Sequence, residues 1–332
     1  MSPILHTEVA APTDVSTLKA KLAATTPAAA PTLASPTAPI TPTTTTSSSS
    51  SDDDDAAFTL PIATHDRILR DLRTLKEGHS HIRFNSRDWV GMTDAEIDAE
   101  LRTLEHEMDL LPKDRWVPGN WSRFRSYSRA VVLPWEKPMR VRYLPPYLDE
   151  NGDEQVPYNQ GMFNADCNNV RRWYKPVTEP VRNLRLLNRM ILSDVALCDW
   201  NEDELRHPIL VGIHFVKTAP TPDWPVGINT PNALHQDGHK FSVVHMVRRR
   251  NAKGGENIVA APQYQDCHPS TIPQEDVIAT FTLEEPLDSF AVYDDKCTHY
   301  AGAVLQDDPS QSTERSVFIL DIEPMVAAVC PI

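Results

Sequence analysis

Three side chains in this sequence have the types and spacing needed to hold a metal ion. His235 and Asp237 stand two residues apart, and His299 follows far downstream. In an extended segment the side chains at i and i+2 share a face, so His235 and Asp237 can point at one ion while His299 approaches from another strand. Two imidazoles and one carboxylate cover one face of an octahedral iron in non-haem Fe(II) oxygenases. We therefore predict that His235, Asp237 and His299 are the metal ligands and the catalytic centre.

Arg315 adds a second chemical function. It opens the run Arg315–Asp321, which predicts a buried strand because its residues are mainly β-branched, aromatic and aliphatic. A guanidinium at the start of such a strand can hold a carboxylate through two parallel hydrogen bonds. A metal triad with a carboxylate anchor is what a 2-oxoglutarate-dependent oxygenase requires. The predicted cofactor is Fe(II), with 2-oxoglutarate and O2 as cosubstrates and Arg315 as the 2-oxoglutarate anchor. A zinc hydrolase with the same ligands would leave Arg315 without a role.

An arginine-rich segment is the first candidate for substrate binding. Arg123, Arg125, Tyr127 and Arg129 alternate along a predicted strand, so all four can face one pocket. A cationic pocket suits the α-carboxylate of an amino acid, with one arginine left for a carboxylate in the substrate side chain. The alternative is that one or two of these arginines pair with acidic residues on the surface.

Two histidines complete the predicted substrate-binding set. His214 lies in a predicted strand over 209–216, and a hydrogen-bonded core histidine is an equal alternative for it. His239 has the same parity as His235 and Asp237 and therefore can line the same site.

Composition limits the classes of partner. The formal net charge is −14 at pH 7, and no basic stripe offsets it, which argues against a nucleic-acid partner. The 5 cysteines are odd in number and form no C-x-x-C, which indicates free thiols in a reducing compartment, so we expect a cytoplasmic protein. No apolar run approaches transmembrane length, and no secretory signal is evident. We expect a small-molecule substrate and no membrane or nucleic-acid partner, and the oligomeric state stays open.

The chain divides into a tail and one predicted domain. Residues 1–56 are rich in Ala, Pro, Thr and Ser and predict disorder, so the single oxygenase domain is expected over 57–332. Helices are predicted over 64–77, 93–111 and 179–196, and Thr93 with Glu96 has the spacing of a capping box. Strands are predicted at 209–216, 241–247, 256–260, 278–283, 289–293 and 316–322. This order predicts an α+β fold, with helices packed on a double-stranded β-helix that surrounds the metal.

Several segments in the same order resemble a known family. They are Arg123–Arg129, Val211–His214, Leu234–Gly238, Gly254–Ile258 and Leu283–Leu287, followed by His299 and Arg315. Together, over roughly residues 120–325, they resemble the bacterial isoleucine dioxygenases, which hydroxylate free amino acids with Fe(II) and 2-oxoglutarate. The resemblance implies a jelly-roll, cupin-like fold with iron on His235, Asp237 and His299. It also implies that Arg315 binds the distal carboxylate of 2-oxoglutarate.

The departures from that family concern the substrate. Gly238-His239-Lys240 stands where the isoleucine enzymes carry acidic residues. The low-complexity tail is typical of a eukaryote, and the fungal glutamate hydroxylases of isoxazole amino-acid biosynthesis would fit both this origin and this chemistry. We predict hydroxylation of an aliphatic carbon of a free L-amino acid in specialised metabolism, with glutamate first and isoleucine or leucine next. The alternatives are a peptide or protein hydroxylase with the same metal centre, and a non-catalytic β-barrel binding protein.

Overall fold

The computed structural model describes residues 80–117, 122–167, 169–229 and 231–326. The predicted disordered tail over 1–56 and the predicted helix over 64–77 lie outside these residues. Within them, no helix combines the length and the apolar character that crossing a membrane would require.

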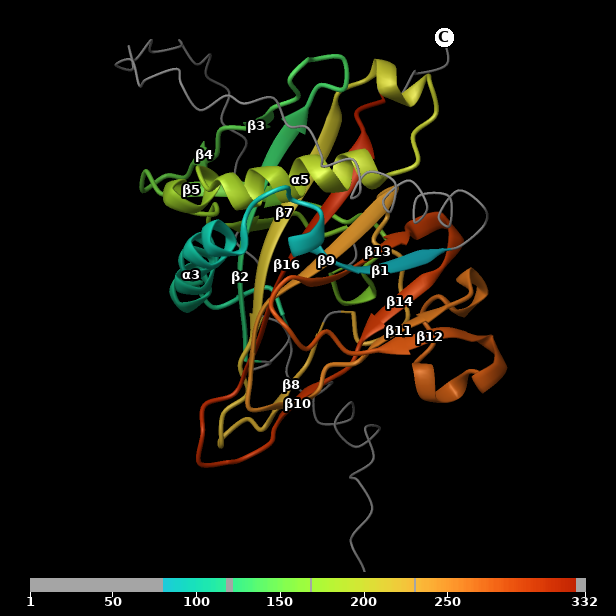
Figure 1. The fold of residues 1–332 in the computed structure, drawn as a ribbon. Coiled ribbons are helices and arrows are strands. Elements are labelled where there is room, and N and C mark those ends of the chain that lie inside the picture. Colours follow the sequence, from blue (N-terminus) through green and yellow to red (C-terminus); the bar gives the residue numbers. More distant parts are fainter. Residues whose placement is uncertain (1–79, 118–121, 168, 230, 327–332) are drawn as a thin grey trace, which may run out of the picture. The chain divides into compact units, whose positions relative to one another are not determined.

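Seven antiparallel strands form the major sheet (Figure 1). In spatial order they are β1 (His81–Asn85), β13 (Asp288–Tyr293), β9 (Phe241–Arg250), β16 (Glu314–Pro324), β7 (Ile209–Thr218), β2 (Arg123–Val132) and β3 (Val141–Tyr143). The central strands are long because their sequences are runs of β-branched and aromatic residues with few turn formers. The predicted strands over 209–216, 241–247, 289–293 and 316–322 are confirmed, each extended by one to a few residues.

Three smaller sheets complete the strand architecture. They are β12 (Val277–Phe281) with β11 (Asn257–Ala260) and β14 (Thr298–Ala301), β10 (Ala252–Gly254) with β15 (Val304–Gln306) and β8 (Val226–Gly227), and β4 (Tyr147–Leu148) with β5 (Glu154–Tyr158) and β6 (Arg172–Tyr174). Val244 and Val317 of the major sheet share a buried cluster with Val259 and Phe281 of the first small sheet. The two sheets therefore face each other across a common interior, as the predicted α+β barrel-like core requires.

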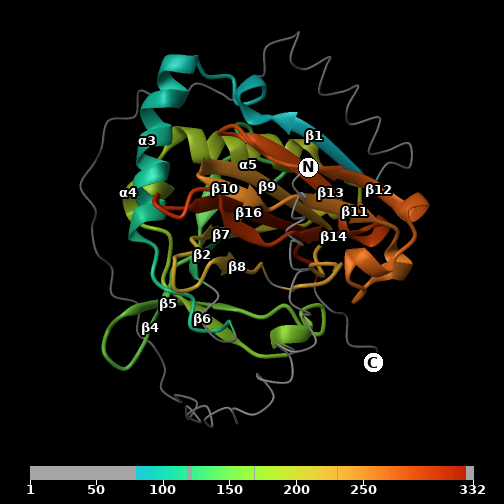
Figure 2. The same ribbon diagram turned by 90° about the horizontal axis from the view of Figure 1, so that it is seen from below.

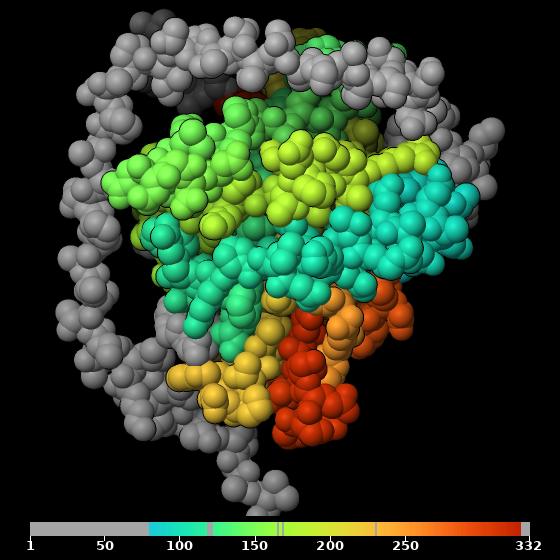
Figure 3. Space-filling model, turned by 90° about the vertical axis from the view of Figure 1, so that its left-hand side faces the viewer, coloured from blue at the N-terminus to red at the C-terminus, as the bar shows by residue number. Residues whose placement is uncertain are grey.

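Helices cover the outer face of the major sheet. Helix α3 (Asp94–Leu110) begins with the predicted capping box, because Glu96 N donates to the Thr93 hydroxyl at 3.3 Å and the Glu96 carboxylate accepts from Thr93 N at 2.8 Å. Its apolar face and that of α5 (Arg185–Leu197) join the outward apolar residues of the sheet in the largest buried cluster. Figure 3 looks onto the side of the molecule where these helices lie. The helices brace the sheet from outside and leave its inner face to the site.

The single helix predicted over 179–196 is wrong in one respect. The structure has two helices there, α4 (Glu179–Arg182) and α5, because Leu184 is extended with ψ of 130°. The new N-terminus is capped from another element: Glu100 of α3 accepts a 2.6 Å hydrogen bond from Leu186 N. A partner far away in sequence satisfies this backbone group, so local periodicity does not reveal the break.

The small β4–β5–β6 sheet lies on the opposite side of the major sheet from α5 (Figure 2). Asn151-Gly152 forms the turn between β4 and β5, where Gly152 has a φ of +84°. Tyr158 of β5 packs against Tyr127 of β2, with ring centroids 5.0 Å apart. This sheet therefore forms a lateral wall over the inner face of β2 and β7.

The pairing of β9 with β16 contains a register shift. Ser316 lies opposite Arg248, but Val317 lies opposite Met246, so Val247 is the extra residue on β9. Arg248 then points outward and pairs with Asp109 of α3. Arg249 lies opposite Arg315, whose side chain lines the interior cavity described below.

Candidate active site

His235 and His299 are joined through their backbones. The N–H of each donates to the carbonyl of the other at 2.9 Å, which forms an isolated antiparallel bridge. The backbone N–H groups of Asp237 and Gly238 donate to the buried Asp294 carboxylate at 2.9 and 2.8 Å. These contacts fix the turn that precedes β9, so His235 and Asp237 are held against a strand that comes from a distant part of the sequence.

The three predicted ligand side chains converge. His235 Nε2 lies 3.6 Å from Asp237 Oδ1, and His299 Nε2 lies 3.2 Å from Asp237 Oδ2. Ligand atoms about 2.1 Å from a metal and at right angles to one another are roughly 3 Å apart, which is close to this spacing. His299 Nε2 is buried and forms no hydrogen bond within the described residues. The donor set and its geometry therefore fit one divalent metal ion.

His235 and Asp237 have the protonation that a metal requires, whereas His299, whose pKa burial would lower but Asp237 raises, must lose its proton when a metal binds. Burial and the nearby His299 lower the pKa of His235 to about 4, and its Nδ1 lies 2.9 Å from the Ala233 carbonyl. A neutral His235 donates from Nδ1 and keeps the Nε2 lone pair free. Burial alone would raise the pKa of Asp237, but the nearby imidazoles of His299 and His235 and the Ser242 hydroxyl hold that pKa well below its ordinary value. A charged carboxylate and a neutral imidazole are the ligand forms that bind metal.

Two further residues position Asp237, and the sequence analysis did not identify them. Gln160 Nε2 donates to Asp237 Oδ1 at 2.9 Å, and the Ser242 hydroxyl donates to Asp237 Oδ2 at 2.8 Å. Gln160 is itself fixed, because its Oε1 accepts from Asn164 and from Arg172, both at 3.1 Å. The loop between β5 and β6 therefore reaches the candidate metal ligand. No periodic pattern marks that loop in the sequence.

Arg315 lies in the same cavity as the triad and is 4% exposed. Its Nη2 donates to Asn257 Oδ1 at 3.5 Å, and no carboxylate among the described residues lies within ion-pair distance of it. Burial and the neighbouring Arg249 lower the pKa of Arg315 to about 10, so the group is still charged at neutral pH. A buried cation that no protein carboxylate neutralises suits a bound anion.

The sequence model of the 2OG-Fe dioxygenase family matches residues 105–321. The chain belongs to this family. It is therefore an oxidoreductase that uses Fe(II) and 2-oxoglutarate, and His235, Asp237 and His299 form the triad-like group that the family leads us to expect. No curated protein sequence matches this dioxygenase.

Solved structures show the same fold. IDO from Bacillus thuringiensis has a TM-score of 0.58 at 15% identity and covers 78% of this chain and 96% of its own. A bsmA homolog from Methylobium petroleophilum has a TM-score of 0.58 at 19% identity, covering 78% and 93%. The Fe(II)/(alpha)ketoglutarate-dependent dioxygenase TqaL has 0.57 at 13% identity, covering 80% and 91%. The dioxygenase therefore has the predicted double-stranded β-helix fold.

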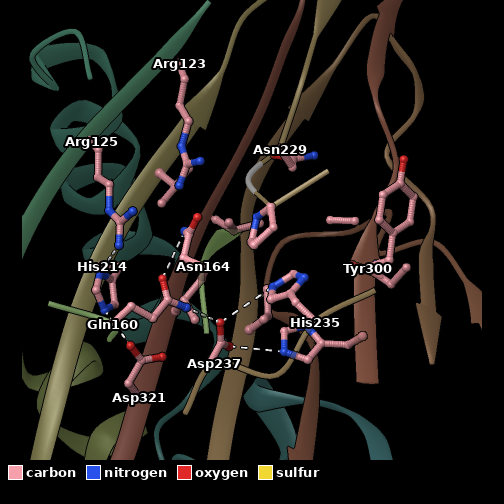
Figure 4. A pocket seen from close by; sticks show the side chains of 18 of the residues that line it. Arg123, Arg125, Gln160, Asn164, His214, Asn229, His235, Asp237, Tyr300 and Asp321 are labelled. Carbon is pink, nitrogen blue, oxygen red and sulfur yellow. Dashed lines mark hydrogen bonds and ion pairs between the residues drawn. The ribbon is translucent and has the colours of Figure 1, made fainter. Parts of the chain in front are cut away.

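Two of the predicted arginines line the cavity of this dioxygenase (Figure 4). Arg123 Nε lies 3.6 Å from Asp114 Oδ2, and Arg125 Nη2 lies 2.5 Å from Nδ1 of His214. His214 lines the cavity as well, and burial lowers its pKa to about 4, so its Nδ1 accepts from Arg125. Tyr127 stacks on the His214 ring at 4.3 Å and lies behind it.

The other two predicted substrate-binding residues lie elsewhere. Arg129 is half-buried and is not among the residues that line the cavity. His239 also lies outside the lining and pairs with Asp321 and Glu323, each at 3.3 Å. Burial would lower the pKa of His239, but these carboxylates raise it to about 9. The alternation of side chains along an extended segment predicts which residues share a face of the sheet. It does not predict which of those residues line the cavity.

Proposed function

We propose that this dioxygenase hydroxylates an aliphatic carbon of a free L-amino acid, with iron held by His235, Asp237 and His299. Arg315 would bind the distal carboxylate of 2-oxoglutarate. The observation that carries the proposal is one cavity that is lined by the triad, the unneutralised Arg315 and a separate pair of arginines, Arg123 and Arg125. Arg315 on β16 and the pair on β2 are separated by β7, and two such cationic places can accommodate two different carboxylates, one of the cosubstrate and one of the substrate.

When bound, iron and 2-oxoglutarate supply O2 activation coupled to oxidative decarboxylation, which yields succinate and CO2. The protein holds and shields the reactants. Gln160 and Ser242 fix the Asp237 carboxylate, and the apolar walls Val244, Phe290 and Val317 exclude water from the space beside Arg315.

The arginine side of the cavity favours an acidic side chain. Arg125 and Arg172 both stack on Tyr158, with guanidinium carbons 5.1 and 4.8 Å from the ring centroid, and neither has a carboxylate partner among the described residues. Arg123 is paired with Asp114. Arg125 lines the cavity and Arg172 is buried against Tyr158, so both add positive charge to this side, and glutamate offers two carboxylates where isoleucine offers one. Glutamate therefore remains the first substrate candidate, with isoleucine and leucine next.

Two measurements test this function in order. Anaerobic titration with Fe(II) and 2-oxoglutarate should produce the weak visible charge-transfer band of the bound pair. A panel of the twenty common L-amino acids should then give substrate-dependent succinate, with a product heavier by one oxygen atom and the largest signal for glutamate. Turnover of isoleucine without turnover of glutamate would refute the charge argument alone. Turnover of peptides without turnover of any free amino acid would favour the peptide hydroxylase instead.

A further inference from the structure

Asp321 is a buried carboxylate in the cavity wall to which the proposed reaction has so far assigned no role. It lies in β16 with the same parity as Arg315, and it is 4% exposed. Figure 4 places Asp321 beside His214 on one side of the cavity and Asp237 with His235 on the other. A carboxylate in such a place needs a partner for each oxygen atom, because an unmatched buried charge is costly.

The two oxygen atoms of Asp321 differ in their partners. Oδ2 accepts from His214 Nε2 at 2.8 Å and from the Tyr158 hydroxyl at 3.3 Å, and it pairs with His239 at 3.3 Å. Among the described residues, Oδ1 has only the Ser242 hydroxyl at 3.5 Å, at the limit of a hydrogen bond. Oδ1 therefore has capacity to accept from a ligand in the cavity.

We propose that Asp321 binds the α-ammonium group of the amino-acid substrate while Arg125 binds its α-carboxylate. This assignment rests on the proposed function and names the residue that would select free amino acids over other carboxylates. The imidazole of His214 lies between Arg125 and Asp321, with one hydrogen bond to each. An α-amino acid head group that hydrogen-bonds at its carboxylate and at its ammonium spans a similar gap.

The charges around each end agree with this orientation. Asp321 and Glu323 both lie 3.3 Å from the imidazole of His239, which can neutralise at most one of the two carboxylates and so leaves at least one negative charge for an ammonium. His214 is neutral and adds no charge, since burial lowers its pKa to about 4. The opposite end, at Arg125, has the positive excess described above. The cavity wall is therefore negative at Asp321 and positive at Arg125, which matches the ammonium and the carboxylate of an amino-acid zwitterion.

The first test uses the wild-type enzyme and needs no variant. Succinate formation is measured with L-glutamate against glutarate, and with L-isoleucine against 3-methylpentanoate, which are pairs that differ only in the amino group. The amino acid that turns over should exceed its des-amino analogue by at least about 30-fold in kcat/KM. Equal turnover of both members of a pair would overturn the assignment.

The second test removes the charge of Asp321 at constant size. Asp321→Asn should lower kcat/KM for the amino acid by at least about 30-fold and change that for the des-amino analogue by less than about threefold. The matched control is Asp307→Asn, the same substitution at an exposed carboxylate that pairs with Lys253 and does not line the cavity. It should preserve the preference for the amino group. Equal losses with both substrates in Asp321→Asn would indicate a merely structural role.

The proposed function and the role assigned to Asp321 can be refuted separately. If wild-type enzyme forms the Fe(II)/2-oxoglutarate band but turns over no amino acid, the proposed function fails and the assignment of Asp321 fails with it. If amino acids are hydroxylated but the amino group makes no difference, only the assignment fails. Loss of the band in Asp321→Asn would leave the wild-type comparison as the deciding measurement.

Discussion

The metal side and the arginine side of the cavity are built in contrasting ways. Two of the three triad residues, His235 and Asp237, come from one short extended segment, and backbone hydrogen bonds join that segment to His299. The arginine side draws on β2, β7, β16 and the loop between β5 and β6, and its groups are held by other side chains. The metal side is therefore fixed by local backbone geometry, whereas the opposite wall depends on a network in which each member orients the next.

The largest effect is expected on the metal side. His235→Ala, Asp237→Ala or His299→Ala should each abolish 2-oxoglutarate-dependent succinate formation, because a facial triad has no spare ligand. Circular dichroism and the melting temperature should stay close to those of wild type. His106→Ala, an exposed histidine of α3, is the control and should retain activity. Full turnover in any triad variant would remove that residue from the candidate site.

Arg315→Lys tests the proposed cosubstrate anchor on β16. A point charge replaces a two-pronged donor, so the apparent KM for 2-oxoglutarate should rise by roughly 30- to 1,000-fold, equivalent to about 2–4 kcal/mol. The KM for the amino acid should change much less. The same substitution at Arg250, exposed on neighbouring β9, is the matched control. Equal changes in both KM values would argue against the assigned role.

Gln160→Ala tests whether the side-chain network on the arginine side of the cavity stabilises the metal site. Gln160 comes from the loop between β5 and β6 and donates to Asp237. Loss of an outer-sphere partner of this kind costs about 10- to 100-fold in metal affinity or activity, and we expect the Fe(II) requirement to rise by that amount. Gln263→Ala, exposed elsewhere, is the control. An unchanged Fe(II) requirement would mean that the metal side is independent of the loop.

The smallest effect is expected from deleting residues 1–55. The segment has no apolar pattern with which to pack against either side of the cavity, so activity should be unchanged within error. Steady-state kinetics of the truncated and full-length proteins make the comparison. A large loss of turnover on truncation would assign the tail a part in the fold or the site.

The difference between the metal side and the arginine side also explains which parts of the site could be predicted from the sequence. The i, i+2 spacing of His235 and Asp237 is visible in the sequence, and so is the strand that begins at Arg315. The alternation in Arg123–Arg129 correctly identified the inner face of β2, and two of its arginines line the cavity. The predicted positions of these residues agree with the structure because each depends on neighbouring residues only, and their roles in binding stay predictions.

The remaining parts of the site depend on contacts between distant segments. Gln160 and Arg172 lie in and next to a loop without periodicity, and only the folded chain brings them to Asp237 and Tyr158. The sequence predicts that His239 binds substrate, but in the structure its imidazole pairs with the carboxylates of Asp321 and Glu323. Asp321 could have been identified from the sequence. It is an acidic residue in an apolar strand, and its side chain lies on the same face of that strand as Arg315.

The extra residue in β9 has a consequence for how this strand tolerates sequence change. Arg248 and Arg249 are identical in type, yet one binds Asp109 of α3 and the other lies beside Arg315. Their roles are set by the count of residues before them, because Val247 shifts the register. Conservative replacement of Val247 should be tolerated, whereas its deletion would exchange the sides of both arginines. At this point chain length, more than side-chain identity, is what an evolving or engineered sequence must preserve.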